Sequence, residues 1–377
     1  MKRRSKHNNV SSGYSLEPGG QLEWASPPVK TLHELNHHFQ THLRWVKAVC
    51  DEHGLSQSDL AIEPLCSPEE IELIDMKKYH VMHNRFLSTG KHGAWMMKNT
   101  TSVQVNLDIS SEADAEEMAY ISDCLQPFCA VLFANSPFMN SQPVGLKNTR
   151  ADVWSDTDKS RCGNLLDHEI SKPEGLLNKF SVYLQNVPTI FVKDGSGKTI
   201  NYEGTLGKWL QEKKKSGILT HQDVLLALHQ VFTHVRFKTV IEIRGADRPP
   251  VGFEMAPAAF WLGLLTAKKT RTQVMALLKK WTVEDRKKLH KLASRLDLNI
   301  NAIGNISFKQ GLDQVCDLAM SGLDERSETL HIKNERSLLE DYVNEINTHG
   351  LPSLRRQKDF AESRVSLREF LFRTRRD

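Results

Sequence analysis

The sequence predicts an α+β fold with a mainly antiparallel sheet and a helical C-terminal section. Strand patterns and helical patterns are mixed without the strict βαβα order that a parallel sheet requires. The clearest strand, at residues 100–108, has one apolar and one polar face. From about Pro257 to the end, apolar residues recur at helical spacing.

The first part of the chain predicts a strand pair followed by a long helix. Residues 14–24 give two short strand patterns, separated by a Pro-Gly-Gly turn. The helix begins near Thr31, because Thr31 and Glu34 have the spacing of a capping box. Gly54 is expected to end this helix.

A loop region and the clearest strand follow this helix. We expect a loop at residues 54–68 with one short strand at 60–62, and then the strand at 100–108. Residues 110–114 open the next helix, and Pro127 should bend or interrupt it because proline lacks an amide hydrogen.

The second half predicts a hairpin, one more strand and a run of helices. Residues 189–192 and 199–202 flank a glycine-containing turn, which indicates a hairpin. Another strand is expected at residues 239–243. Thr282 and Asp285 form a second capping box. The helices expected here are residues 258–265, residues 270–281 and two or three more beyond Thr282.

Length and charge suggest how the chain is organised. The 377 residues allow two domains at about 150 residues each. We expect a basic, disordered tail at residues 1–13, a catalytic α+β domain at 14–265 and a helical section packed on it at 266–377. Residues 355–377 hold eight basic and four acidic side chains, so they account for the whole net charge of +4. A basic tail on a neutral body suggests nucleic acid only weakly, and we expect no nucleic-acid partner.

Several classes of protein are excluded by composition. No apolar run reaches the ~18 residues of a membrane span, and the basic N-terminus leads into no apolar core of a signal peptide. The six cysteines are scattered without a Cys-x-x-Cys pair, which favours reduced thiols and offers no zinc spacing. We therefore expect a cytoplasmic protein with no membrane partner.

The polar face of the strand at residues 100–108 is the first candidate site. Gln104 and Asn106 lie on it, between Ser102 and Asp108, and none of these positions is Lys or Arg. Short polar side chains suit a cavity that binds a small zwitterion, although an ordinary solvent-facing strand has a polar face too.

Acidic residues form the second candidate site. Glu242 and Arg244 share one face of a strand. Either they form a salt bridge, or Glu242 is a metal ligand and Arg244 beside it binds phosphate. Glu17 and Glu23 flank the Pro-Gly-Gly turn near the N-terminus. Together with Glu242 they make a set of carboxylates that could hold hard divalent cations.

A third candidate is the charged segment at residues 150–163. It contains Arg150, Trp154 and Arg161 among several acids. The segment is either a solvated loop or a substrate lid whose cations hold a carboxylate or a phosphate.

Six segments occur in one order along the chain and form a joint pattern. They are SLEPGGQLE (15–23), SVQVNLD (102–108), LFANSPF (132–138), WSDTDK (154–159), EIRGAD (242–247) and PAAFWLGLL (257–265). Jointly they resemble the plant-type glutamate–cysteine ligases. The resemblance implies a glutamine-synthetase-like fold in which an antiparallel sheet forms a funnel for ATP, Mg²⁺ and the substrates.

The implied reaction joins the γ-carboxylate of L-glutamate to the amine of L-cysteine, the first step of glutathione biosynthesis. A carboxylate is a poor electrophile, so ATP must first convert it to a γ-glutamyl phosphate, and catalysis depends on charge neutralisation and positioning. By resemblance, Arg244 contacts phosphate and Arg150 contacts a substrate carboxylate. The other implied roles are metal ligands for Glu17, Glu23 and Glu242, and substrate contacts for Gln104, Asn106, Trp154 and Arg161.

The sequence also departs from the family pattern. The family has an earlier acidic strand that completes the metal site, whereas residues 1–13 contain no Asp or Glu, so we expect that strand to be missing. Lys78 and Asn99 stand where arginines are expected, and lysine lacks the bidentate fork of arginine. Three accounts fit: a ligase whose start lies upstream, a shortened paralogue without turnover, or a scaffold whose basic segment at residues 355–376 binds acidic partners. The sequence does not indicate an oligomeric state.

Overall fold

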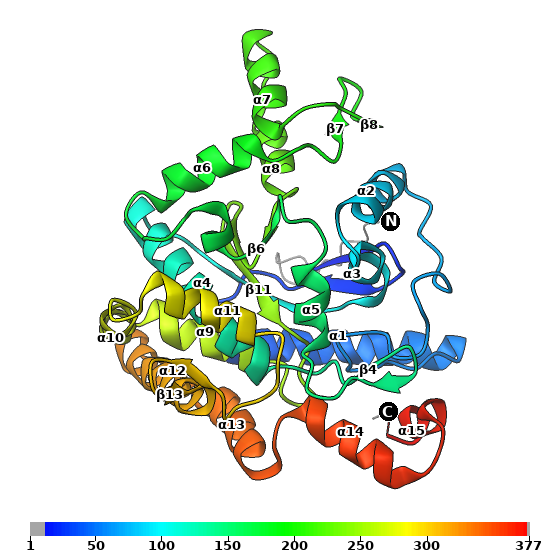
Figure 1. The fold of residues 1–377 in the computed structure, drawn as a ribbon, viewed down its shortest axis with the longest axis vertical. Coiled ribbons are helices and arrows are strands. Elements are labelled where there is room, and N and C mark those ends of the chain that lie inside the picture. Colours follow the sequence, from blue (N-terminus) through cyan, green and yellow to red (C-terminus); the bar gives the residue numbers. More distant parts are fainter. Residues whose placement is uncertain (1–11, 375–377) are drawn as a thin grey trace.

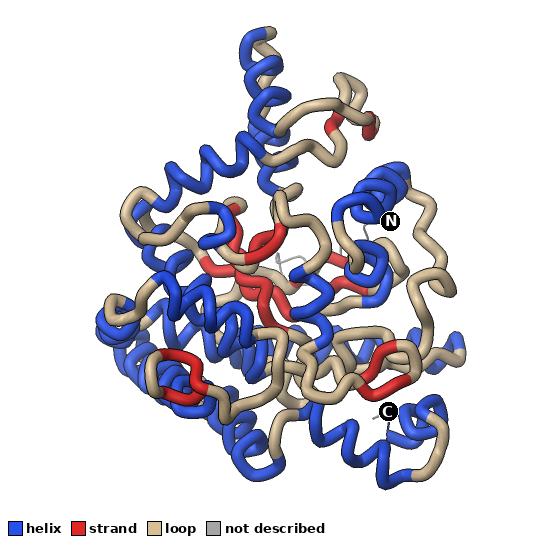
Figure 2. Tube along the Cα trace, in the orientation of Figure 1, coloured by secondary structure: helices blue, strands red, loops and turns tan. Residues whose placement is uncertain are grey.

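A three-stranded antiparallel sheet lies at the centre of the protein, in a computed structural model that describes residues 12–374 (Figure 1). Its order is β10 (Val235–Phe237), β11 (Ile241–Ala246), β3 (Val103–Leu107). Helices surround the strands (Figure 2). The strands predicted at 100–108 and 239–243 are confirmed, with β3 shorter than predicted and β11 extending to Ala246.

The register of this sheet brings polar side chains together. β11 pairs Glu242 with Arg236 of β10 on one side and with Asn106 of β3 on the other. Directly opposite residues point to the same face of a sheet. The pairing of β11 with β3 shifts between Ile243 and Ala246, so the strand carries an irregularity after this polar row.

The predicted α+β class and antiparallel pairing hold for this sheet and for most of the small ones. One pair is parallel, formed by β6 (Cys162–Gly163) and β9 (Phe232–Thr233). Among the described residues the sheets have two or three strands and do not close into a barrel. The glutamine-synthetase-like funnel therefore stays a prediction.

The predicted N-terminal hairpin is confirmed as β1 (Gly13–Leu16) and β2 (Leu22–Ala25). Its turn is held against the end of helix α3 (Gly93–Asn99), where Gln21 Nε2 donates to the Met97 and Thr100 carbonyls at 3.2 and 3.1 Å. A β-carbon at Gly19 would overlap the backbone of Lys98. The hairpin can approach this closely because position 19 has no side chain.

The first long helix, α1 (Leu32–His53), follows its predicted signals. The Thr31 side chain accepts from the amide of Glu34, and Gly54 ends the helix with φ 63°. The short strand expected at residues 60–62 is reduced to an isolated bridge between Ile62 and Thr100.

Helix α4 (Glu112–Leu132) tests the prediction that Pro127 bends or interrupts it, and the interruption is wrong. Pro127 lies inside it and does not interrupt it. Every residue from Ile121 to Leu132 is buried, and the packing of this segment outweighs the hydrogen bond that proline removes.

The C-terminal third is helical, as predicted, with one exception. Helix α11 (Val283–Leu292) starts with the predicted capping box of Thr282 and Asp285. A small hairpin, β12 (Asn301–Ile303) and β13 (Ile306–Ser307), interrupts the helices and was not predicted. The other helices of this part are α10 (Lys268–Leu278), α12 (Phe308–Leu330), α13 (Ser337–His349), α14 (Pro352–Ser363) and α15 (Leu367–Thr374).

Helix α12 crosses α9 (Ala256–Thr266) at two glycines. A β-carbon at Gly263 would overlap the Ala319 carbonyl, and one at Gly322 would overlap the carbonyl of Gly263. The largest apolar core runs from Leu32 to Leu351 and so joins both predicted domains. The boundary at residue 265 stays a prediction, and residues 1–11 of the predicted tail lie outside the described part.

The remaining elements flank this core. Helices α6 (Leu176–Asn186), α7 (Leu206–Lys215) and α8 (His221–Leu228) project at the top of Figure 1, beside the predicted hairpin β7 (Val192–Lys193) and β8 (Thr199–Ile200). The others are α2 (Lys77–Thr89), α5 (Thr149–Ser155), the 3₁₀ turn at Leu165–His168, β4 (Phe138–Met139) and β5 (Gln142–Pro143). No helix within residues 12–374 has the length and apolar character to span a bilayer.

The basic C-terminal segment uses much of its charge within the chain. Arg355 pairs with Glu345, and Arg356 Nη2 lies 2.5 Å from Asp59 Oδ2. Within α14 and α15, Lys358 and Arg373 each pair with a glutamate one turn away. These contacts weaken the account in which this segment serves mainly to bind acidic partners.

Candidate active site

Three cations surround one buried carboxylate on the polar face of the central sheet. Glu242 is 0% exposed, and Arg236 Nη2 lies 2.8 Å from its Oε1. Arg244 contacts the same oxygen, and Lys238 contacts Oε2. We call Arg236, Lys238 and Arg244 with Glu242 the cation cluster. Its excess of positive charge suits a polyanion such as a phosphate chain.

The protonation of the cluster follows from its geometry. Burial alone would raise the pKa of Glu242, but the charges of Arg244, Arg236 and Lys238 outweigh it and hold this pKa well below its usual range. Burial, with the charge of Arg244, lowers the pKa of Arg236 to about 10. Glu242 is therefore ionised at neutral pH, and Arg236 is protonated.

Glu17 and Glu23, which we call the acid pair, lie beside the cation cluster. Burial raises the pKa of Glu17, and the neighbouring Glu23 raises it further, while Lys78 and Arg244 oppose the rise. The two carboxyl groups share a hydrogen bond, and Ser15 Oγ donates to Glu23 Oε2 at 2.7 Å. The hairpin thus brings two acids together within the field of Arg244.

Lys78, one of the departures noted in the sequence, has a place in this geometry. Its Nζ lies 4.3 Å from the ring centroid of Tyr79, and its charge acts on Glu17. The Tyr79 hydroxyl donates to the Leu16 carbonyl at 2.6 Å and ties α2 to the hairpin. The other departure, Asn99, is buried and donates to the Cys66 carbonyl at 2.9 Å.

The acid pair suits Mg²⁺ better than the predicted set of three carboxylates does. Mg²⁺ is commonly held by one or two carboxylates together with substrate phosphates and water. Within residues 12–374, no three acidic, histidine or cysteine side chains are arranged to hold a metal ion. Glu242, predicted as the third ligand, instead directs both oxygens at cations, and their charge disfavours a further cation at this position.

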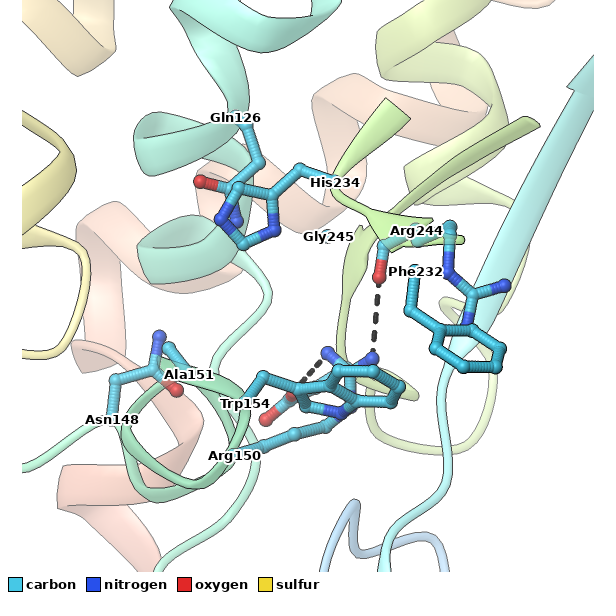
Figure 3. A pocket seen from close by; sticks show the side chains of 10 residues that line it. Gln126, Asn148, Arg150, Ala151, Trp154, Phe232, His234, Arg244 and Gly245 are labelled. Atoms are coloured by element: carbon cyan, nitrogen blue, oxygen red, sulfur yellow. Dashed lines mark hydrogen bonds and ion pairs between the residues drawn. The ribbon is translucent and has the colours of Figure 1, made fainter. Parts of the chain in front are cut away.

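A pocket next to the cation cluster has a cavity volume of about 20 Å³ and opens to solvent at its mouth. Figure 3 shows Arg150 and Trp154 on one side of the view and Gln126 and His234 on the other. We call it the Arg150 pocket. Its lining residues are Gln126, Asn148, Arg150, Ala151, Trp154, Phe232, His234, Arg244, Gly245 and Asp247.

Arg150 is fixed at the wall of this pocket by protein contacts. Its Nη1 lies 3.3 Å from Asp247 Oδ1, and its Nη2 donates to the Arg244 carbonyl at 3.2 Å. Arg150 is 5% exposed, and its Nε has no hydrogen-bond partner. Trp154 Nε1 likewise is buried without a partner. Two donors are therefore left for a ligand with acceptor groups.

Arg244 joins the cation cluster to the Arg150 pocket. Its guanidinium contacts Glu242 and lies 5.6 Å from the Trp154 ring centroid and 5.8 Å from that of Phe232. The same residue lines the pocket and accepts from Arg150 through its carbonyl. One side chain thus borders both the phosphate-suited face and the pocket.

The other predicted substrate residues lie outside the pocket lining. Asn106 is beside Glu242 in the sheet register, and Gln104 is two residues away on the same strand face. Arg161 is fully buried, and its donors go to Asp158 Oδ2 at 2.8 Å and to the carbonyls of Gln230 and Pro188. The structure therefore gives Arg161 a supporting position.

Sequence reasoning missed several residues of the site. His234, Arg236 and Lys238 alternate at a spacing of two, which is a readable strand signal. Gln126 is the polar residue in the apolar run from Cys124 to Leu132 of α4, and a lone polar residue in such a run is a second usable signal. Asn148 has no such signal, because it lies in the turn before a helix of seven residues.

Comparisons with known proteins place this geometry in context. Residues 5–351 match the family described as glutamate–cysteine ligase family 2. The chloroplastic glutamate–cysteine ligase of Brassica juncea is 34% identical over 321 residues, which are 83% of this chain and 61% of that protein. The Arabidopsis thaliana enzyme of the same name is 34% identical over 83% of this chain and 60% of its own length. The chain thus spans about three fifths of the length of these relatives.

Proposed function

Because the chain belongs to glutamate–cysteine ligase family 2, we propose that it joins the γ-carboxylate of L-glutamate to the amine of L-cysteine in an ATP-dependent reaction. This is the first step of glutathione biosynthesis. The names of the matched relatives support the proposal. The predicted cytoplasmic location belongs to the same proposal, while those relatives are named as chloroplastic.

The position of Arg244 carries the proposal. A γ-glutamyl phosphate forms only where the terminal phosphate of ATP and the γ-carboxylate of glutamate meet. Arg244 borders both the cation cluster and the Arg150 pocket, which supports a contact between its guanidinium and the transferred phosphate. Charge neutralisation at this point lowers the barrier of phosphoryl transfer.

The cation cluster acts on the nucleotide. Arg236 and Lys238 add positive charge next to Arg244, and Glu242 fixes all three in place. Glu17 and Glu23 would hold Mg²⁺, which supplies further charge neutralisation when bound with the nucleotide. A preformed set of charges needs no rearrangement when charge develops on the phosphate.

The Arg150 pocket acts on the amino acid. Arg150 Nε and Trp154 Nε1 are buried donors without partners, suited to a substrate carboxylate. We keep Gln104 and Asn106 in the proposal as substrate contacts, because they lie on the same face of the sheet as Glu242 and Asn106 pairs with it. Arg161 supports the site through Asp158, which also pairs with Arg85.

The direct test is an activity assay on the full chain. Incubation with ATP, Mg²⁺, L-glutamate and L-cysteine should yield ADP and γ-glutamylcysteine in equal amounts. Arg244→Lys, which keeps the charge but loses the fork, should lower kcat/KM about 100-fold. Arg295→Lys, at an exposed position, should leave it unchanged. A folded wild-type protein that forms no product would refute the proposal.

A further inference from the structure

We infer that the side-chain acceptors of Gln126 and Asn148 in the lining of the Arg150 pocket bind the ammonium group of an α-amino acid. These two side chains present acceptors, whereas Arg150 and Trp154 present donors to the carboxylate. The inference deepens the proposed function and relies on it only for which amino acid is bound. It assigns a recognition role to two residues that the sequence analysis did not identify.

Asn148 supplies an acceptor whose orientation is fixed. Its Nδ2 donates to the Ala130 and Ala293 carbonyls, both at 2.9 Å. These two bonds identify the donating atom of the amide as the nitrogen, so the other atom, Oδ1, is the carbonyl oxygen. Asn148 is 1% exposed, and its Oδ1 has no hydrogen-bond partner. A buried oxygen of this kind is expected to have a ligand donor.

Gln126 supplies the second acceptor. It is 3% exposed, and its Oε1 is also buried without a partner. A β-carbon at Gly245 would lie 2.9 Å from Gln126 Cγ and 3.1 Å from its Nε2. Glycine at position 245 therefore makes the room that the glutamine amide occupies in the pocket wall.

Charged groups of both signs surround these acceptors, because Arg150 and Arg244 line the pocket together with Asp247. Burial, together with nearby His290, lowers the pKa of His234 to about 3, so this lining residue is uncharged at neutral pH. Beyond it, His290 lies beside Asp123, with Nε2 3.7 Å from Oδ2. Asp247, the partner of Arg150, adds a carboxyl group to the lining. An ammonium entering here meets acceptors and no added positive charge from His234.

The complete pattern fits a zwitterion better than it fits other ligands. Two donors on Arg150 and Trp154 match a carboxylate, and two acceptors on Gln126 and Asn148 match an ammonium, which has three N–H bonds to donate. A nucleobase also combines donors and acceptors, but it is uncharged, whereas Arg150 and Asp247 are ionisable groups at the wall. An α-amino acid carries both charges within a few ångströms.

The test compares ligands that carry the ammonium group with analogues that lack it. Calorimetry on the full chain compares L-glutamate with glutarate, and L-cysteine with 3-mercaptopropionate, which lack only the ammonium. The wild-type protein should prefer one amino acid over its deaminated analogue, and the pair that shows the preference identifies the ligand. Equal affinity within both pairs would overturn the inference without recourse to any variant.

Two substitutions sharpen the result. Gln126→Met keeps the size but removes the acceptor, so affinity for the amino acid should fall about 10- to 100-fold, as for one lost hydrogen bond to a charged group. Affinity for the analogue should not change. Gln126→Glu keeps an acceptor and should restore binding. Equal losses for amino acid and analogue, or a selective loss of ATP binding, would overturn the inference.

The outcome is distinguishable from that of the proposed function. Selective amino-acid binding that Gln126→Met abolishes, without formation of γ-glutamylcysteine, would support the ammonium site and refute the ligase proposal. Product formation with no selective effect of Gln126→Met would do the reverse. Melting temperatures of both variants show whether each is folded before its binding is compared.

Discussion

The cation cluster and the Arg150 pocket are neighbours, yet they satisfy their polar groups in opposite ways. In the cluster, both oxygens of Glu242 face cations of the same sheet. In the pocket, four buried polar atoms have no partner. The first arrangement is satisfied by protein contacts, whereas the second leaves donors and acceptors available to a ligand or to water. Substitutions in the cluster should therefore affect stability first, and substitutions in the pocket should affect binding first.

The largest expected effect is the loss of stability in Glu242→Gln, and its absence would contradict this comparison. Glu242→Gln leaves the buried Arg236 and the partly buried Lys238 and Arg244 without their common carboxylate, and we expect the free energy of unfolding to fall by about 3–5 kcal/mol at pH 7. Urea denaturation measures it. Glu362→Gln, in an exposed pair with Lys358, is the control and should change it by less than about 1 kcal/mol.

The pH dependence of the stability gives a second test with the same variant, Glu242→Gln. A depressed pKa means that the carboxylate stabilises the fold above the ordinary glutamate pKa, and that this stabilisation is lost as the pH falls toward the folded-state pKa. The stability difference between wild type and Glu242→Gln should therefore shrink in acid. A constant difference would contradict the ion cluster.

For Glu17 of the acid pair, the stabilising contribution should change with pH in the opposite direction. The raised pKa of Glu17 means that its stabilising contribution is present below the ordinary glutamate pKa and is lost as the pH rises through the folded-state pKa. Glu17→Gln should therefore raise the melting temperature at pH 7, while Mg²⁺-dependent ATP affinity falls about tenfold or more. Glu52→Gln, at an exposed position of α1, should change neither. A lower melting temperature with unchanged ATP affinity would assign Glu17 a structural role.

The smallest expected effect sharpens the description of the pocket. Trp154→Phe keeps a ring beside Arg244 but removes the unpartnered Nε1 donor. Affinity for the amino-acid substrate should fall about 2- to 10-fold, with no loss of stability because no protein hydrogen bond is broken. Trp45→Phe, at a 43% exposed position, is the matched control. A large stability loss in Trp154→Phe would show that the indole mainly supports the fold.

The cation cluster could be predicted in part because it depends on local patterns. Glu242 and Arg244 alternate along one strand, and the alternation predicted their shared face correctly. It did not reveal that Arg236 of β10 and Lys238, in the turn between β10 and β11, would contact the Glu242 oxygens, because the register of a hairpin depends on the geometry of its turn. The salt bridge therefore depends on a pairing that the sequence alone does not determine, and a metal-ligand role of Glu242 stays a prediction.

The Arg150 pocket was harder to predict, because its residues come from separate elements. Gln126 comes from α4, Asn148 precedes α5 and His234 lies between β9 and β10. Helix α5 is so short that its residues were assigned to a loop, since two turns give too little periodicity. The caps of α1 and α11, by contrast, depend on residues three apart. The capping box of α11 was predicted correctly, whereas at α1 only the Thr31 half of the predicted box forms and Glu34 accepts from the Lys30 amide.

The crossing of α9 and α12 has a consequence for how this protein can vary. At Gly263 and Gly322 the two backbones touch, so the distance between the helices is set by main-chain atoms alone. No larger residue at either position can be compensated by trimming a side chain opposite, because none is there. Variation at this crossing is therefore confined to changes that move whole helices, and α9 follows β11, the strand that carries Glu242 and Arg244.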